Sequence, residues 1–168
     1  MIGSIVLIGA PGSGKTTVGA MLAERLGVTF NDADAIIVER AGKSIAEIFT
    51  DDGEADFRAL EEQVTAELLE LPGVLSLGGG AVLSSTTRAA LLSHRVVWLR
   101  IGLSQSVKRV GLDTARPLLL GNVRGQLLKL LNERAPLYAE VATEVVDTDD
   151  TTPTEVVETI MNAHAARR

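Results

Sequence analysis

The stretch Gly9-Ala10-Pro11-Gly12-Ser13-Gly14-Lys15-Thr16 decides the fold, because it fills every position of the pattern G-x-x-x-x-G-K-[ST]. An apolar run, residues 5–8, precedes it, and residues 18–26 follow it with apolar side chains at helical spacing. A strand, a glycine-rich loop and a helix in this order form a P-loop, whose backbone N–H groups and positive helix end point at the same spot. The sequence therefore predicts a polyphosphate-binding site.

The side chains of this loop have different expected roles. Lys15 should reach the β- and γ-phosphates of a nucleotide as a point charge, and the Thr16 hydroxyl should help to hold Mg²⁺. The nucleotide-binding residues expected in this loop are Gly12, Ser13, Gly14, Lys15, Thr16 and Thr17.

The composition indicates one globular domain over residues 1–168, since 46% of the residues are hydrophobic and 23% are charged. The absence of cysteine excludes a disulfide framework, a thiolate zinc site and a cysteine nucleophile. A formal charge of -6 and an aromatic content of 3% argue against a general nucleic-acid-binding protein, which needs cationic and base-stacking side chains.

Hydropathy bears on where the protein works. No apolar run approaches the roughly 18 residues of a membrane span, and the P-loop strand begins too early to leave room for a signal peptide in front of it. We therefore expect a cytoplasmic protein without a membrane partner.

Apolar runs and helical patterns alternate along the rest of the chain. Beyond the P-loop strand, the predicted strands are residues 28–30, 74–77, 96–101 and 144–148. The main helices predicted between and after them are 54–69, 87–92, 104–110, a helix after 124 that ends near 134–138, and one that starts at a capping box, 152–155. Residues 44–47 also have capping-box spacing, for a short turn through Phe49. This alternation predicts an α/β fold with about five parallel strands, covered by helices on both faces.

Two carboxylates, Asp32 and Asp34, follow the predicted strand 28–30 directly. The carboxyl edge of a parallel sheet is where ligands bind in such folds. The spacing alone is equally compatible with helix capping. The P-loop favours a functional interpretation, because nucleotide chemistry needs one carboxylate near Mg²⁺ and often a second one to orient the acceptor hydroxyl.

Three further features each allow a functional and a structural interpretation. Arg58 and Glu61 lie one helical turn apart and can pair, although such pairs are more often solvated surface pairs. The glycines 78–80 would let backbone N–H groups approach a ligand, unless they form a flexible loop. Residues 111–124 contain Arg116 and read either as a lid over the nucleotide or as a surface connection. We interpret as packing or capping residues Trp98, Tyr138, His94 and His164.

Together these motifs resemble the shikimate kinases, which are small relatives of the nucleoside monophosphate kinases. Besides the P-loop, the matching stretches are Asp-Ala-Asp at 32–34, Asp-Phe-Arg at 56–58 with Glu61, Leu-Gly-Gly-Gly-Ala at 77–81, Ala-Arg-Pro-Leu-Leu at 115–119 and Arg-Ala-Pro-Leu-Tyr at 134–138. The resemblance implies a parallel sheet of order 2-3-1-4-5. It also implies transfer of the γ-phosphoryl group of ATP to the 3-hydroxyl of shikimate, with one Mg²⁺ per subunit, in the biosynthesis of chorismate and aromatic amino acids.

The resemblance also implies a role for each matching residue. Within a substrate-binding region of about 32–61, Asp34 would bind the shikimate hydroxyls and orient or deprotonate the attacking one. The carboxylate of shikimate would be clamped by Arg58 and Arg134, with Glu61 fixing Arg58. The same pocket would be lined by the backbone of Gly78, Gly79 and Gly80.

The nucleotide side follows from the same resemblance. Asp32 would hold Mg²⁺ through water, beside Thr16. Arg109 would flank the adenine or the phosphates, and Arg116 would reach the phosphates when the lid closes. The catalytic residues expected are Lys15, Asp34 and Arg116.

One stretch departs from the family pattern, because Asp149-Asp150-Thr151-Thr152 stands where relatives often carry an arginine that stacks on adenine. Two other functions stay open at this point. A kinase for another hydroxylated acid, such as gluconate, is disfavoured by the glycines 78–80 and by the stretch 134–138. A non-catalytic nucleotide-binding protein is disfavoured by the intact Lys15, Asp34 and Arg116. We expect a monomer whose partners are ATP or ADP and shikimate.

Overall fold

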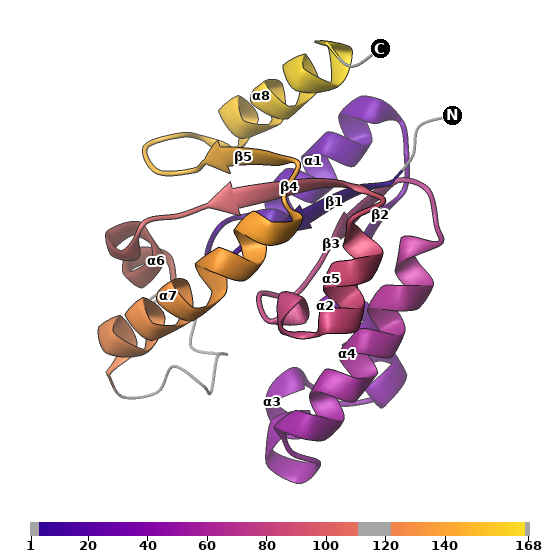
Figure 1. Ribbon diagram of the computed structural model, residues 1–168, viewed down its shortest axis with the longest axis vertical. Helices are drawn as coiled ribbons and strands as arrows, with labels where there is room; N and C mark the ends of the chain where they lie inside the picture. Colours follow the sequence, from indigo (N-terminus) through magenta and orange to yellow (C-terminus); the bar gives the residue numbers. More distant parts are fainter. Residues whose placement is uncertain (1–3, 111–121, 167–168) are drawn as a thin grey trace.

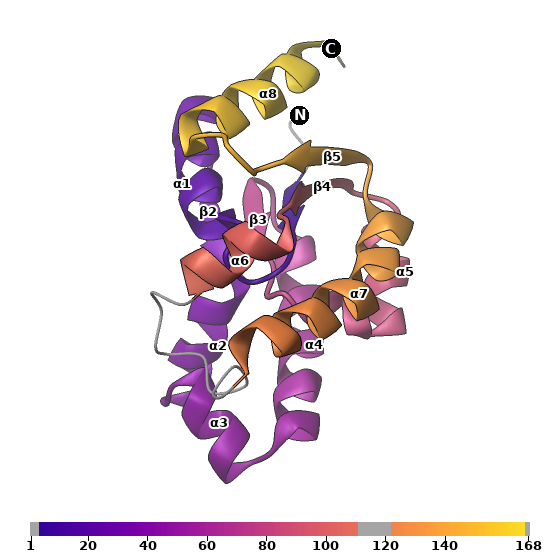
Figure 2. The same cartoon turned by 90° about the vertical axis from the view of Figure 1, so that its left-hand side faces the viewer.

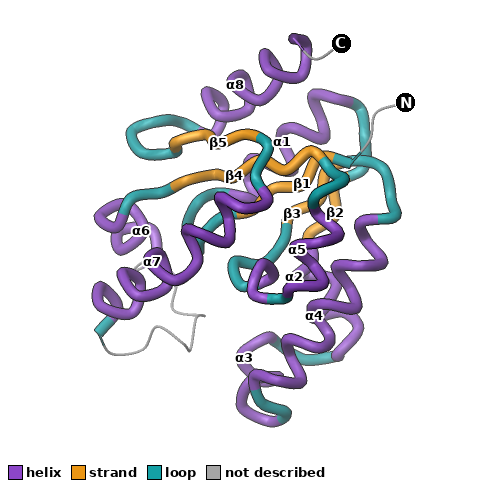
Figure 3. The backbone as a smooth tube through the Cα atoms, viewed as in Figure 1, coloured by secondary structure: helices purple, strands orange, loops and turns teal. Residues whose placement is uncertain are grey.

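Parallel strands form one sheet in the order β2-β3-β1-β4-β5 in the computed structural model, which describes residues 4–110 and 122–166. The strands are β1 (Ile5–Ile8), β2 (Phe30–Asp32), β3 (Val74–Ser76), β4 (Arg95–Arg100) and β5 (Glu144–Asp147). The central strand β1 pairs on both sides, since Val6 lies opposite Leu75 of β3 and Val96 of β4. Figure 3 shows the strands side by side. This order confirms the predicted topology.

Helices cover both faces of the sheet (Figure 1). One face carries α1 (Lys15–Leu26) and α8 (Pro153–Ala166), and the other carries α2 (Ala33–Ala41), α4 (Glu54–Leu69), α5 (Ser85–Leu91) and α7 (Val123–Val141). The other helical elements are α3 (Ile45–Asp51), α6 (Leu103–Val110) and the 3-10 turn η1 (Ala81–Leu83). Figure 2 shows that α2, α3 and α4 reach away from the sheet. Within the described ranges, no helix has the length and apolarity needed to cross a membrane.

Strand β1 separates two apolar clusters. Ile5 and Leu7 pack against α1 and α8, whereas Val6 and Ile8 pack in the cluster that contains α2, α4, α5 and α7. All four side chains are buried, which accounts for an apolar run without polar alternation before the P-loop. The P-loop therefore starts at the carboxyl end of the most protected strand.

Strand β2 lies two residues later than the sequence predicts. The N–H of Val28 donates to the carbonyl of Ala23 at 3.0 Å, so Val28 closes α1 instead of joining the sheet. Pairing with β3 starts at Phe30, opposite Val74. Asp32 is consequently the last residue of β2 and also the N-cap of α2.

Helix α7 begins earlier than predicted. The N–H of Gly125 donates to Oδ1 of Asn122 at 3.1 Å, which makes Asn122 the N-cap. Residues 123 and 124 therefore belong to the helix and not to the predicted loop 111–124.

The same helix also ends later than predicted, because it continues past Pro136 to Val141. A proline removes one backbone donor, but α7 packs against η1, α5 and β4, and the buried side chains of Tyr138 and Val141 lie beyond the proline. The prediction that it ends near 134–138 is wrong because tertiary packing outweighs the local signal of the proline.

Two capping boxes form as predicted. In α3, Oγ of Ser44 accepts from the N–H of Glu47 at 3.1 Å. In α8, Oγ1 of Thr152 accepts from the N–H of Glu155 at 3.2 Å, and the carboxylate of Glu155 accepts from the N–H of Thr152 at 3.4 Å. The predicted helix 54–69 coincides with α4.

Candidate active site

The loop between β1 and α1 has the backbone geometry of an anion-binding nest. Gly12 and Gly14 have φ angles of 84° and 90°, in the left-handed region that favours glycine. The ammonium group of Lys15 lies against the loop, where it donates to the carbonyls of Gly9 (2.7 Å) and Ala10 (3.2 Å). A nest, a helix N-terminus and a cation therefore meet at one point, which suits a phosphate group.

A cavity of about 220 Å³ joins this loop to the two aspartates. It is lined by Pro11, Gly12, Gly14, Lys15, Thr16, Thr17, Asp32, Asp34, Ser76, Leu77 and Gly79. The fold thus brings together the carboxyl ends of β1, β2 and β3, as expected for a ligand site in an open parallel sheet. Ser76 was not predicted here, although a polar residue inside an apolar strand was the available signal.

Thr16 and Asp32 meet at one wall of this cavity, where Oγ1 of Thr16 donates to Oδ2 of Asp32 at 2.8 Å. The other oxygen of Asp32 caps α2, since it accepts from the N–H groups of Asp34 (2.9 Å) and Ala35 (3.3 Å). Asp32 therefore caps α2 with one oxygen and contacts Thr16 with the other. Helix capping and a role near Mg²⁺, the two interpretations of its spacing, are thus compatible.

These two oxygen-bearing side chains fit a magnesium ion, which prefers hydroxyl and carboxylate ligands and keeps several waters. Over residues 4–110 and 122–166, no group of three or more histidine, aspartate and glutamate side chains could hold a metal by itself. A cation at Thr16 and Asp32 would consequently take its remaining ligands from phosphate groups and water.

Arg58 and Glu61 form a buried pair on α4, not a solvated one. Nη1 of Arg58 lies 2.9 Å from Oε1 of Glu61, and Glu61 is only 3% exposed. The guanidinium also lies over the rings of Phe57 (5.2 Å) and Phe49 (6.0 Å). Its Nε is buried and has no hydrogen-bond partner in the described part of the chain. Such a donor suits a bound anion.

Glu61 also contacts the region of Asp34. A β-carbon on Gly78 would lie 2.7 Å from Oδ1 of Asp34 and 3.0 Å from Oε2 of Glu61, so both carboxylates face this glycine. Burial raises the pKa of Glu61, the pairing with Arg58 opposes this shift, and the charges of Asp34 and Arg134 have smaller effects of opposite sign. The site therefore holds two carboxylates and two guanidinium groups within electrostatic reach of one another.

The glycines 78–80 make room for these charged side chains. A β-carbon on Gly79 would lie 3.3 Å from Nη1 of Arg134, and one on Gly80 would lie 2.7 Å from Cζ of Arg58. None of the three glycines has φ in the left-handed region. Glycine is therefore required at these positions because a side chain would crowd or collide with the charged groups, and not because the backbone is unusual. Arg134 itself comes from α7 and is 7% exposed.

Two hydroxyl groups hold the loops of the site through bonds that the sequence does not predict. Tyr138 of α7 donates to the carbonyl of Gly79 at 2.6 Å. Ser106 of α6 is fully buried and donates to the carbonyl of Pro11 at 3.2 Å. Neither residue shows its role in local sequence, because its partner lies far away along the chain.

A second cavity, of about 260 Å³, lies on the other side of the P-loop. It is lined by Gly12, Ser13, Gly14, Thr17, Val18, Arg109, Thr148, Thr151, Pro153 and Val156. Arg109 bridges its walls by donating to the carbonyls of Gly12 (2.9 Å) and Thr148 (3.1 Å). Oγ1 of Thr151 is buried there without a hydrogen-bond partner in the described part of the chain. The stretch 149–152 therefore supplies a hydroxyl where an arginine was expected.

The remaining predicted residue, Arg116, and residues 111–121 of the predicted lid lie outside the described residues.

Comparison with known proteins points to one family. A family model described as shikimate kinase matches residues 11–165. The chain is similar to the shikimate kinase of Thermobifida fusca, with 58% identity over 92% of this chain and 91% of the relative. It is also similar to that of Saccharopolyspora erythraea, with 55% identity over 97% and 94%. The solved structure of the Acinetobacter baumannii shikimate kinase in complex with shikimate superposes with a TM-score of 0.96 at 36% identity, over 100% of this chain and 96% of that one.

Proposed function

This chain belongs to the shikimate kinase family, and we propose that the cavity between the P-loop and Asp34 is where the 3-hydroxyl of shikimate meets the γ-phosphate of ATP. The chain is an ATP-dependent phosphotransferase that acts on shikimate. Its products are then ADP and shikimate 3-phosphate, a step toward chorismate and the aromatic amino acids.

One observation carries the proposal: Asp34 and Lys15 line the same cavity. Lys15 approaches the transferring phosphate from the loop, and Asp34 receives or orients the attacking hydroxyl. Phosphoryl transfer asks for positioning and electrostatic stabilisation more than for covalent work by the protein.

The shikimate carboxylate binds between Arg58 and Arg134 in this proposal. Both guanidinium groups reach the glycines 78–80 from different helices, and Arg58 keeps a buried Nε donor without a partner in the described part of the chain. A planar guanidinium can bind a carboxylate through two parallel hydrogen bonds, which a lysine cannot do. Glu61 holds Arg58 in place at 2.9 Å.

ATP is the co-substrate, and one Mg²⁺ per subunit would be held by Thr16 and, through water, by Asp32. When bound, this ion neutralises charge on the β- and γ-phosphates. The adenine base is placed in the cavity beside Arg109 and Pro153, with the Thr151 hydroxyl as a polar contact. Arg116 and the rest of the predicted lid, apart from residues 123 and 124 of α7, are proposed phosphate contacts on the strength of the family resemblance alone. The same resemblance supports a monomer that works in the cytoplasm.

The test is ADP release from ATP and Mg²⁺ with shikimate, with gluconate and without an acceptor. We expect turnover with shikimate only. Asp34→Asn should lower kcat by about 10²- to 10⁴-fold, the usual loss of a positioned acid or base, while KM for ATP stays within about twofold. Glu24→Gln, which changes an exposed carboxylate near the C-terminal end of α1, is the matched control and should keep full activity.

Two results would contradict the proposal. Turnover with gluconate would be consistent with a kinase but would refute the assignment of the pocket to shikimate. Unchanged turnover in Asp34→Asn would remove that residue from the chemistry.

A further inference from the structure

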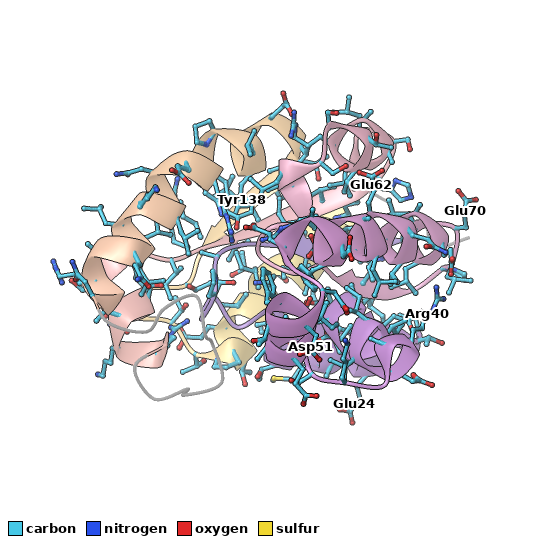
Figure 4. The ribbon with its side chains drawn as sticks, turned by 90° about the horizontal axis from the view of Figure 1, so that it is seen from below. Glu24, Arg40, Asp51, Glu62, Glu70 and Tyr138 are labelled. Carbon is cyan, nitrogen blue, oxygen red and sulfur yellow. The ribbon has the colours of Figure 1, made fainter. Side chains whose placement is uncertain are left out.

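Tyr138 is the most deeply buried aromatic residue beside the site. It is 1% exposed, and its hydroxyl donates to the carbonyl of Gly79 at 2.6 Å. Figure 4 shows its side chain pointing from α7 toward the interior of the molecule, whereas Glu24 and Glu70 lie at the periphery. Burial raises the pKa of Tyr138 to about 12, although the charge of Arg134 acts against this shift. The phenol therefore remains a donor at every pH at which the enzyme would be assayed.

The partner of this hydroxyl lies at a crossing point of the site. A β-carbon on Gly79 would lie 3.3 Å from Nη1 of Arg134, 3.2 Å from Cδ of Pro11 and 3.4 Å from the carbonyl oxygen of Gly9. The backbone of Gly79 thus lies between Arg134 and the P-loop, close to both. Whatever fixes the Gly79 peptide also fixes the spacing between the guanidinium and the loop.

Tyr138 and Arg134 stand four residues apart on α7, so they share one face of the helix. A ring contact with Trp98 of β4, with centroids 5.5 Å apart, holds the Tyr138 ring against the sheet. A buried phenol therefore joins the helix that carries Arg134 to the loop that faces it.

The outer end of the same loop is tied to α7 independently. Arg88 donates to the carbonyl of Val82 at 2.8 Å and pairs with Glu140 at 2.7 Å. Glu140 is largely exposed, so this outer tie is solvated, whereas the bond from Tyr138 to Gly79 is not. The inner tie is also the nearer one to Arg134, because Gly79 is the residue that faces Nη1 of Arg134.

We propose that Tyr138 is a positioning residue for shikimate: by holding the Gly79 carbonyl, it keeps Arg134 and the glycines 78–80 at the spacing that the carboxylate and hydroxyls of the substrate require. This role rests on the proposed function. It assigns Tyr138 no contact with the substrate, because Gly79 and Arg134 stand between them.

Tyr138→Phe tests the role, since it removes the hydroxyl and keeps the ring on Trp98. We expect KM for shikimate to rise about threefold to tenfold, the ratio that the loss of one buried hydrogen bond produces. KM for ATP should stay within about twofold, because Lys15 and Arg109 are held by other bonds. The matched control is Thr143→Val, which removes a hydroxyl that donates to the carbonyl of Val96 at 2.9 Å, far from the site. It should lower stability and leave both KM values unchanged.

An unchanged KM for shikimate in Tyr138→Phe would overturn the inference. If the unsubstituted chain releases no ADP with shikimate, the proposed function itself has failed, which is a different result. A second measurement needs no variant: Tyr138 is the only tyrosine in the chain, so 3-fluorotyrosine labelling yields one ¹⁹F signal. Shikimate should shift this signal and gluconate should not. A ¹⁹F chemical shift that does not change with saturating shikimate would also overturn the positioning role of Tyr138.

Discussion

Glu61 differs from its neighbours on α4 because it is a buried carboxylate, and this has a consequence for stability. Burial raises its pKa above the ordinary value of 4.5 even though Arg58 pairs with it. Between 4.5 and the raised value, the folded chain binds more protons than the unfolded chain. The free energy of unfolding therefore falls as pH rises through this window, since the buried group becomes charged.

Glu61→Gln removes that titration. We expect the free energy of unfolding of the variant, relative to that of the unsubstituted chain, to increase as pH rises from 4.5 and to level off above the raised pKa. Urea unfolding at a series of pH values measures this difference.

Glu67→Gln is the control of opposite sign. Its partner Arg40 lowers the pKa of the exposed Glu67, so the stabilisation is present above 4.5 and is lost as pH falls through the lowered value. A difference that does not change with pH for Glu61→Gln would show that its burial has no energetic effect on titration.

At the scale of elements, the N-terminus of α8 borders the cavity in which we propose that adenine binds. Thr152 and Glu155 close its capping box, while Thr151 and Pro153 on either side of the cap line the cavity of about 260 Å³. A frayed first turn would move these two residues away from Arg109. Helix α3 is also capped by a hydroxyl, that of Ser44, which accepts from the N–H of Glu47, and α3 has no residue in that cavity.

Thr152→Ala should lower the free energy of unfolding by about 1 kcal/mol, the usual loss for an N-cap. We also expect KM for ATP to rise by up to about fivefold, the ratio that this energy corresponds to, with KM for shikimate unchanged. Steady-state kinetics and urea unfolding measure both effects. Ser44→Ala should reproduce the loss of stability alone. An equal KM for ATP in the two variants would show that the cap of α8 has no role in nucleotide binding.

At the scale of the whole molecule, the P-loop is a wall shared by two cavities. Gly12, Gly14 and Thr17 line both of them, one toward Asp34 and the other toward Arg109. In the proposed arrangement, shikimate binds in the cavity that contains Asp34 and adenine binds in the cavity beside Arg109. The binding of ATP and the binding of shikimate can be distinguished by their dependence on Mg²⁺.

Each ligand at 100 times its Kd should stabilise the fold by about 2.7 kcal/mol, which corresponds to a rise in Tm of roughly 5–10 °C for a chain of this size. Thermal unfolding with ATP and Mg²⁺, with shikimate, and with each plus EDTA measures these increments. We expect EDTA to reduce the increment from ATP, because in the proposed site Thr16 and Asp32 would hold the ion beside the phosphates. The increment from shikimate should stay unchanged. A loss of both increments would argue against separate sites.

The sequence by itself determined the elements and the nature of the chemistry. The P-loop pattern, the capping boxes at 44–47 and 152–155, and the helix 54–69 were predictable, because each depends on residues within a few positions of one another. The pairing of Arg58 with Glu61 was predictable for the same reason, but its burial was not. Strand order and the roles of single residues came from the resemblance of the motifs to a family.

Only the tertiary structure decided how these pieces meet. The bond from Tyr138 to Gly79 joins residues 59 positions apart, and that from Arg109 to Gly12 joins residues 97 apart. No local pattern reports such contacts. The continuation of α7 through Pro136 and the start of β2 at Phe30 were likewise decided by packing and strand pairing, which outweigh local propensity. Periodicity describes near neighbours along the chain, whereas a site is built from neighbours in space.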